Sequence, residues 1–286
     1  MHLAQITRDG RTGLVAKLDE TTVAGHLEGD PAYPGSLAEL LSQGVPLADV
    51  GAKLRASGTR SPLADVQFLP PLVSPSKILC VGLNYRDHAA EAGMALPDYP
   101  TLFTRFASSL VAHGQPLVRP RASTQLDYEA ELVAVIGKRG RHIPRDRALE
   151  HVVGYSLFND ASVRDFQLRT GQWTAGKNFD GTGAFGPWLT LASALPPGAR
   201  GLHIETKLNG EVLQSASTDQ MIFDVPELVA VISAFLTLEP GDIIVTGTPS
   251  GVGFVRKPAL FMKAGDVCEV AIEGLGTLRN PVVDER

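Results

Sequence analysis

The chain has 286 residues, of which 44% are hydrophobic and 20% are charged, and its formal net charge is −5. This composition is that of a folded globular protein and excludes a disordered one. The mild acidity and the lack of a run of Lys or Arg argue against nucleic-acid binding, and no stretch approaches the ~18 apolar residues of a membrane span.

The first 70 residues predict a small domain in which no chemistry stands out. Short apolar runs precede a helix expected to begin after Ser36, which has Glu39 three positions further on, as in a capping box. The segment 70–75, PPLVSP, cannot continue a helix. We therefore predict a small N-terminal domain over residues 1–70 and a main domain over residues 71–286.

The N-terminus and the two cysteines bear on the location of the protein in the cell. The N-terminus lacks the basic and then apolar layout of a secretory signal. Cys80 and Cys268 lie in apolar runs, which predicts two buried thiols and excludes a disulfide framework. We expect a cytoplasmic protein.

From residue 77 onward the pattern predicts a β-rich fold. Short β-branched runs are separated by Gly and Pro, and Asn209-Gly210 between two of them is a strong hairpin signal. Residues 226–238, PELVAVISAFLTL, are the best candidate for a helix.

The segment 84–91, NYRDHAAE, places His88 and Glu91 three residues apart. On a helical turn the carboxylate can orient the imidazole and raise its basicity, which makes a general-base pair. A surface His–Glu pair has the same spacing, so the pattern alone leaves both interpretations open. Gly93 and Pro97 bracket the segment, and we expect it to close over a bound ligand.

The segment 126–137, LDYEAELVAVIG, carries Glu129 and Glu131 at the head of an apolar strand. Alternation puts both on one face roughly 7 Å apart, close enough to converge on one cation. Asp160 ends another apolar strand, and either Asp160 or Ser162 can also serve as the cap of a helix over residues 161–170. Three carboxylates at strand ends suit Mg²⁺ better than zinc, since no His or Cys accompanies them.

The segment 171–178, GQWTAGKN, falls one residue short of a phosphate-binding loop, and we reject that function because Asn178 lacks the required hydroxyl. Lys177, shielded by Trp173, Phe179 and Trp188, can stabilise an oxyanion or can be an ordinary surface lysine. The Gly-rich turn 246–253, TGTPSGVG, can bring backbone N–H groups to an anion such as a carboxylate, or can be a tight turn only.

Taken together, residues 77–285 resemble the fumarylacetoacetate hydrolase superfamily. The resemblance is carried by segments in the family's order: KILCVGLNYRDHAAE, LDYEAELVAVIGK, GYSLFNDASVRDFQ, QWTAGKNFDGTGAFGP, LNGEVLQ and LEPGDIIVTGTPSGVG. It implies an α+β, β-rich fold with a mixed β-roll or barrel-like catalytic domain beside a small N-terminal α/β domain, and a homodimer.

The resemblance also implies roles for individual residues. Mg²⁺ or Mn²⁺ is expected at Glu129, Glu131 and Asp160, and the catalytic residues are expected to be His88, Glu91 and Lys177. Substrate contacts are expected from Arg86, Arg105, Arg164, Gln167 and Thr248. Many members carry lysine at the position of Arg105, and a guanidinium binds carboxylates differently from an ammonium.

The implied activity is metal-dependent hydrolysis of a C–C bond in a small anionic 2-oxo acid such as an acylpyruvate. His88 would activate water, Lys177 would stabilise the oxyanion, and the metal would stabilise the enolate that leaves. Decarboxylation of oxaloacetate and hydration or isomerisation of a keto acid on the same site are the alternatives. From another class, a non-catalytic keto-acid binder would not need His88, Glu91 and Lys177.

Overall fold

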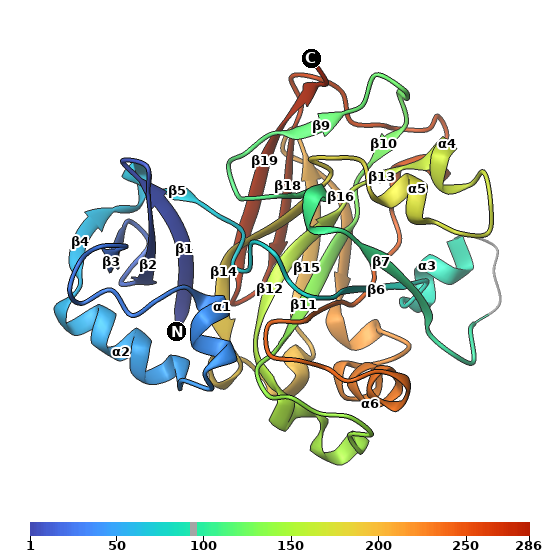
Figure 1. The fold of residues 1–286 in the computed structure, drawn as a ribbon. Coiled ribbons are helices and arrows are strands. Elements are labelled where there is room, and N and C mark those ends of the chain that lie inside the picture. The colour runs from blue at the N-terminus through green and yellow to red at the C-terminus, as the bar shows by residue number, and fades with distance from the viewer. Residues whose placement is uncertain (92–95) are drawn as a thin grey trace.

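The computed structural model describes the backbone of residues 1–91 and 96–286, and the side chains of these residues except 88–90. It is a strand-rich α+β structure (Figure 1). The N-terminal part contains β1 (His2–Arg8), β2 (Arg11–Lys17), β3 (Thr22–Leu27), β4 (Thr59–Pro62), β5 (Gln67–Phe68), α1 (Leu37–Ser42) and α2 (Leu47–Ser57). The predicted capping box is confirmed, because Ser36 Oγ accepts from Glu39 N–H and Glu39 accepts from Ser36 N–H.

Most of the remaining strands form two sheets. The strands that extend the large sheet are β6 (Ile78–Gly82), β7 (Thr101–Arg105), β8 (Leu110–Val111), β11 (Ala130–Ile136), β12 (Val152–Asp160), β14 (Gly183–Leu191) and β17 (Ile243–Val245). The second sheet contains β9 (Leu117–Arg119), β15 (His203–Leu208), β16 (Glu211–Ser217), β18 (Val267–Ile272) and β19 (Gly276–Asp284), and β10 (Leu126–Asp127) pairs with β13 (Ser162–Val163).

The remaining helices of the described chain are short except for one. The α-helices are α3 (Arg86–Glu91), α4 (Arg164–Gln167), α5 (Thr174–Lys177) and α6 (Val225–Phe235). The 3₁₀ turns are η1 (Leu63–Asp65), η2 (Ala107–Ser109), η3 (Arg145–His151), η4 (Ala192–Ala194), η5 (Pro197–Ala199), η6 (Thr218–Gln220) and η7 (Gly253–Val255). Helix α6 confirms the helix expected near 226–238, and in the described part of the chain no helix is long and apolar enough to cross a membrane.

The N-terminal strands and the rest of the chain share one sheet. Its main path runs β4-β3-β2-β1-β14-β12-β11-β17-β6-β7, and β1 pairs with β14 through His2 opposite Thr190. Leu3 and Leu14 also pack in one apolar cluster with Phe158 and Phe185. The domain boundary near residue 70 stays a prediction, and the structure adds that hydrogen bonds and core packing continue across it.

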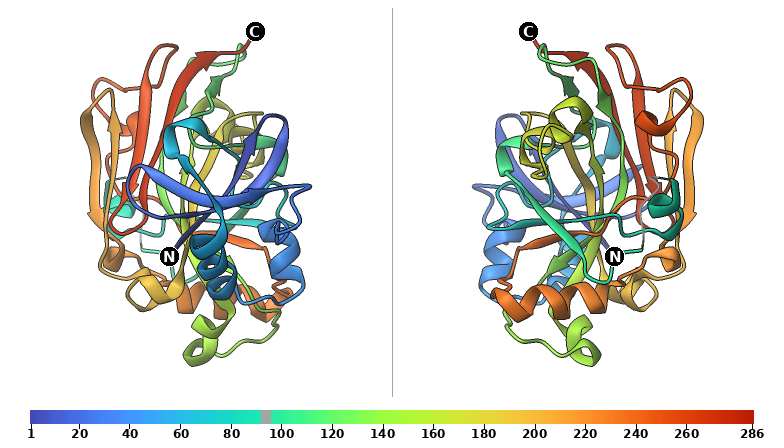
Figure 2. Two further views of the ribbon diagram at one scale, coloured as in Figure 1. Left: turned by 90° about the vertical axis from the view of Figure 1, so that its left-hand side faces the viewer. Right: turned by 90° about the vertical axis from the view of Figure 1, so that its right-hand side faces the viewer.

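Strand β11 lies at the centre of the fold and all seven of its residues are buried. Its odd-numbered residues, such as Val133, belong to the cluster on the N-terminal side, and its even-numbered residues, such as Leu132, belong to the cluster toward the second sheet. Figure 2 shows the large sheet from two sides, with the second sheet beside it. A strand covered on both faces is apolar throughout, which explains the run LVAVI.

The register of β11 and β12 decides where the polar residues meet. The two strands are antiparallel, with Ala130 opposite Asn159 and Glu131 opposite Phe158. The start of β11 therefore lies beside the end of β12, and Asp160 N–H donates to Glu129 O at 3.0 Å. Two segments separated by about thirty residues of chain are brought together at one edge of the buried core.

The hairpin predicted at Asn209-Gly210 forms, whereas the helix cap predicted at Asp160 does not. Asn209 and Gly210 both have positive φ between β15 and β16, which confirms the hairpin. The helix expected after Asp160 is only the four residues of α4, and its N-cap is Val163 without a side-chain hydrogen bond. The expectation of a cap was wrong because the Asp160 carboxylate contacts Arg105 and Lys177.

Candidate metal centre and active site

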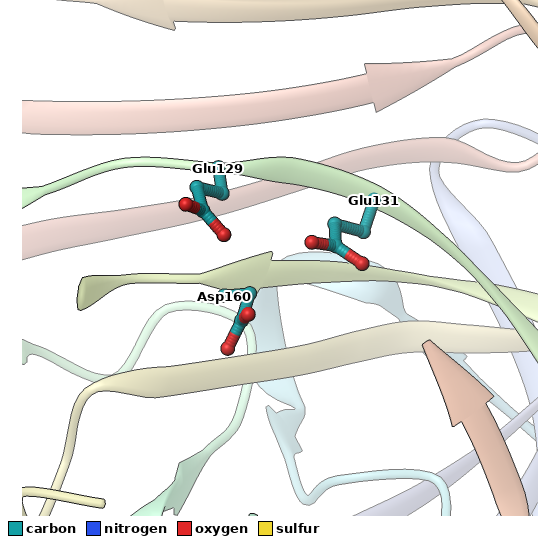
Figure 3. A group of neighbouring side chains, drawn as sticks. All are labelled: Glu129, Glu131 and Asp160. Atoms are coloured by element: carbon teal, nitrogen blue, oxygen red, sulfur yellow. The ribbon is translucent and has the colours of Figure 1, made fainter. Parts of the chain in front are cut away.

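Glu129, Glu131 and Asp160 meet at the junction of β11 and β12 (Figure 3). One carboxylate oxygen of each lies within 4.8 Å of the others, and the three residues are 5%, 1% and 0% exposed. Three buried like charges repel strongly unless positive charge lies among them. The cluster therefore requires cations, and the protein supplies some of them itself.

Lys177 is the cation between two of these carboxylates. Its Nζ lies 2.7 Å from Glu129 Oε2 and 2.6 Å from Asp160 Oδ2, and the residue is 1% exposed. Helix α5 ends at this lysine, and Gly176 before it packs so closely on Gln167 that a Cβ would lie 2.4 Å from the Gln167 backbone N. Burial alone would lower the pKa of Lys177, but Asp160 and Glu129 raise it more. Lys177 is therefore held as an ammonium.

Two arginines contact the same carboxylates. Arg164 Nη1 lies 2.8 Å from Glu129 Oε1, and Arg164 Nε lies 2.8 Å from Asp127 Oδ2. Arg105 Nη1 donates to Asp160 Oδ1 at 2.5 Å. Glu131 instead accepts from a backbone group, Gly247 N–H, at 2.5 Å. Each acid is thus oriented by a donor from another part of the chain.

The fit of this cluster to a divalent cation follows from its charges and its donor atoms. Burial, with the carboxylates of Asp160 and Glu129 nearby, raises the pKa of Glu131 well above its ordinary value. Further positive charge beside Glu131 would therefore favour its ionised form. Three carboxylates that converge in a buried site are the oxygen set that Mg²⁺ and Mn²⁺ take, and the triad could hold such an ion.

A cavity of about 100 Å³ lies against the cluster. Its polar lining is Glu129, Glu131, Arg164, Gln167, Lys177 and Thr248, and its apolar lining includes Val81, Phe103, Leu168, Trp173 and Phe254. Arg164 Nη2 is buried and has no hydrogen-bond partner among the described residues. An unsatisfied guanidinium nitrogen beside a cavity is a donor for an anionic ligand.

A larger groove of about 1040 Å³, lined by Lys17, Phe68 and Trp188 among others, lies in the N-terminal part and includes none of the three acids.

The five predicted substrate contacts divide into two groups. Arg164, Gln167 and Thr248 line the cavity, whereas Arg86 and Arg105 do not. Arg86 is exposed on α3. Arg105 is buried, and its three nitrogens donate to Asp160, Ala161 O, Thr182 and Ser109. This geometry favours a role for Arg105 in orienting the Asp160 carboxylate and does not favour a substrate contact.

The predicted His88–Glu91 pair is described only in part. The helix predicted for this segment is present as α3, and Glu91 accepts from Gly251 N–H at 3.2 and 3.1 Å through its two oxygens. The His88 side chain and Gly93 lie outside the described residues. The general-base pair and the closing movement of this segment therefore stay predictions.

The site also contains residues that the sequence patterns did not single out. Asp127 accepts from Arg164 and from the backbone N–H groups of Gly253 and Phe254, at 2.7–3.0 Å. Alternation along a strand puts Asp127 on the same face as Glu129, so the sequence contained a signal that could have identified Asp127. Lys177 Nζ lies 5.0 Å from the Phe103 ring, and the expected shielding by Trp188 was wrong because that ring packs against Phe68.

Comparisons with known proteins show the family of the chain. The profile described as "Fumarylacetoacetate (FAA) hydrolase C-terminal" matches residues 77–283. The chain is 41% identical over 256 residues to oxaloacetate tautomerase Fahd2a, mitochondrial, of Rattus norvegicus, covering 89% of this chain and 82% of that protein. It is 43% identical over 258 residues to the Homo sapiens protein of that name, FAHD2A, with the same coverage.

Solved structures agree with these relatives. A fumarylacetoacetate hydrolase from Exiguobacterium antarcticum has a TM-score of 0.86 and 37% identity, with 100% of both chains covered. A 2-hydroxyhepta-2,4-diene-1,7-dioate isomerase from Mycobacterium marinum has a TM-score of 0.76 and 33% identity, covering 100% of this chain and 99% of that one. The chain belongs to the fumarylacetoacetate hydrolase family.

Proposed function

We propose that this protein is a Mg²⁺- or Mn²⁺-dependent enzyme that interconverts the keto and enol forms of a short 2-oxo dicarboxylic acid, with oxaloacetate as the first candidate. The observation that carries the proposal is the convergence of three buried carboxylates and Lys177, with the unsatisfied Arg164 Nη2 on an arginine that contacts one of them. Both glutamates, Lys177 and Arg164 line one small cavity. Two kinds of relatives support it, because their printed names specify dicarboxylates with oxygen at C2.

Glu129, Glu131 and Asp160 would hold the cation. When bound, it would act as a Lewis acid toward the 2-oxo acid and make the proton on C3 more acidic. Lys177 would donate a hydrogen bond from Nζ to the oxygen at C2, where negative charge develops as the proton leaves. An ammonium already held among carboxylates needs little reorganisation for this task.

Arg164 would bind the second carboxylate of the substrate. Its Nε and Nη1 are engaged by Asp127, Glu129 and Gln167, while Nη2 is buried without a partner among the described residues, and Arg164 is one of the residues that line the cavity. A dicarboxylate would satisfy this buried donor, and a monocarboxylate would leave it unpaired, which is costly. The cavity volume of about 100 Å³ agrees with a short acid.

The proton acceptor in this proposal is His88, with Glu91 as the group that orients it. The carboxylate of Glu91 is itself held by Gly251 N–H in the Gly-rich turn. This contact links helix α3 to the turn that also contributes Thr248 to the cavity. His88 would carry the proton between C3 and the oxygen at C2.

The experiment is a spectrophotometric assay of the enol form of oxaloacetate with purified, metal-supplemented protein. We expect the enol absorbance to decay faster than in buffer, with Mn²⁺ or Mg²⁺ required and no pyruvate formed. Pyruvate formed from oxaloacetate at the same rate would make decarboxylation the activity. No acceleration of either reaction would overturn the proposal.

The second candidate is the C–C bond hydrolysis of an acylpyruvate. It would use the same Glu91 carboxylate held by Gly251 N–H, since hydrolysis also needs a well-oriented base to activate a water. Acylpyruvates would be tested by the release of pyruvate in the same buffer. A turnover of acylpyruvate that exceeds that of oxaloacetate by about tenfold or more would favour hydrolysis.

A further inference from the structure

Each acid of the triad has one oxygen engaged by a donor from another part of the chain. Arg164 Nη1 contacts Glu129 Oε1 at 2.8 Å, Gly247 N–H contacts Glu131 Oε2 at 2.5 Å, and Arg105 Nη1 contacts Asp160 Oδ1 at 2.5 Å. The opposite oxygens of Glu129 and Asp160 both contact Lys177 Nζ. Lys177 Nζ is therefore the point that these two oxygens share.

Arg105 is the most firmly held of the three donors. Its Nη1 also donates to Ala161 O at 3.2 Å, its Nη2 donates to Thr182 Oγ1 at 2.7 Å, and its Nε donates to Ser109 Oγ at 3.2 Å. The side chain is 0% exposed. A Cβ at Gly183 would lie 2.9 Å from Nη2, so the guanidinium fills the space that this glycine leaves.

A carboxylate held in this way offers a cation its other oxygen most readily, because a donor already occupies one acceptor position of the first. Turning Asp160 so that both oxygens face the cation would break its bond to Arg105 and leave a buried guanidinium nitrogen without that partner, which is costly. Ca²⁺ takes six to eight oxygens and often binds a carboxylate through both, whereas Mg²⁺ keeps near-octahedral geometry with single oxygens and waters. Mn²⁺ takes the same kind of oxygen set as Mg²⁺.

We propose that Arg105 is a positioning residue that makes Asp160 a one-oxygen ligand and thereby selects Mg²⁺ or Mn²⁺ against Ca²⁺. This inference rests on the metal-dependent function proposed above. It assigns Arg105 a role different from the substrate contact that the family resemblance implied. It also explains why this chain has an arginine here. The planar guanidinium reaches Asp160, Thr182 and Ser109 with fixed geometry, which the single ammonium of a lysine cannot do.

The test is calorimetric titration of the chelator-treated full-length protein with Mn²⁺ and with Ca²⁺, which reads binding and not activity. For Arg105→Met we expect the ratio of the Ca²⁺ Kd to the Mn²⁺ Kd to fall by about tenfold or more. The ratio is the informative quantity because both ions carry the same charge. Loss of the Arg105 charge alone would change both Kd values in the same proportion.

Two further variants keep the test decisive if Arg105→Met does not fold. Arg105→Lys retains the charge and one donor, and its ratio should stay nearer that of the wild type. Thr182→Val removes an anchor of the guanidinium, and its ratio should fall in part. Arg139→Met is the matched control, because Arg139 is exposed and pairs with Glu239, and both Kd values should match the wild type.

The outcomes separate this inference from the proposed function. Wild-type protein that binds neither ion would overturn both. Wild-type protein that binds Mn²⁺ with a ratio unchanged in Arg105→Met and Thr182→Val would overturn only the role of Arg105. If Arg105→Met does not fold, an unchanged ratio in Thr182→Val overturns that role by itself.

Discussion

Lys177 and Asp160 form a buried ion pair in which Nζ and Oδ2 are 2.6 Å apart, and neither side chain is more than 2% exposed. The lysine ends helix α5 and the aspartate ends strand β12, so the contact joins two elements at the site. An ion pair this deep is a weak argument for stability, because desolvation offsets much of its attraction. Its place beside the cavity is better explained by chemistry.

Replacing Lys177 with Met tests that explanation. We expect kcat to fall by about 100-fold or more, since one donor to a developing oxyanion is lost. The chelator-treated variant should also be less stable by about 3–5 kcal/mol, because Asp160 and Glu129 lose their buried partner. Urea unfolding should show that Mn²⁺ stabilises the variant more than the wild type. A variant with wild-type kcat would remove Lys177 from the proposed chemistry.

Metal removal is the second prediction. Exhaustive chelation should abolish the accelerated enol decay, and added Mn²⁺ or Mg²⁺ should restore it. Glu131→Gln should weaken Mn²⁺ binding by about tenfold or more, because an amide oxygen replaces a charged ligand. Calorimetry measures this affinity, and Glu205→Gln is the control, since Glu205 pairs with Lys207 in the second sheet. Activity that survives complete chelation would contradict every metal-dependent version of the function.

The acids of the site could be predicted from sequence because they depend on local rules. Alternation along one strand places Glu129 and Glu131 on one face, and the end of an apolar run locates Asp160. The pairing of these two strands in the structure then brings the acids together. The β-rich character after residue 77, the hairpin at Asn209-Gly210 and helix α6 also follow from local patterns.

The surroundings of the acids could not be predicted in this way. Arg105 meets Asp160 because β8, a few residues after Arg105, pairs with β14 at Gly183, and Gly183 lies opposite Asp160 of β12, so the order β8-β14-β12 joins distant segments. No periodicity in the chain encodes that order or the parallel pairing of β6 with β17. The interpretation of Asp160 as a helix cap failed for the same reason, since its partners Arg105 and Lys177 come from other elements.

Gly247 provides the third prediction, because its N–H orients Glu131. Its φ is +98°, and a Cβ there would lie 2.7 Å from Asn84 Cβ and 3.0 Å from Val81 O. Gly247→Ala should cost about 1–3 kcal/mol of unfolding free energy from backbone strain, with a further cost from the clash. The shifted N–H should also weaken Mn²⁺ binding.

The matched control for this variant is Gly241→Ala. Gly241 has a similar φ of +89°, but a Cβ there would meet nothing within 4 Å. It should show the strain cost without a change in the Mn²⁺ Kd. Equal effects of the two substitutions on Mn²⁺ binding would show that the Gly247 N–H does not act on Glu131.

The pH dependence of stability gives the last prediction, at His2 in strand β1. Burial, the N-terminal ammonium and Lys17 lower the pKa of His2 from 6.5 to about 4. Between these values the unfolded chain binds the proton and the folded chain does not, so the free energy of unfolding should decrease as pH falls from 6.5 toward 4. His2→Gln should therefore show a smaller decrease in the free energy of unfolding between pH 7 and pH 5, measured by urea unfolding. Thr190→Val, which removes the hydroxyl 2.8 Å from His2 Nδ1 but keeps the titrating ring, should lower stability at both pH values and retain the wild-type decrease. If His2→Gln and the wild type lose the same stability over this pH range, the surroundings of His2 in the folded chain do not oppose its protonation.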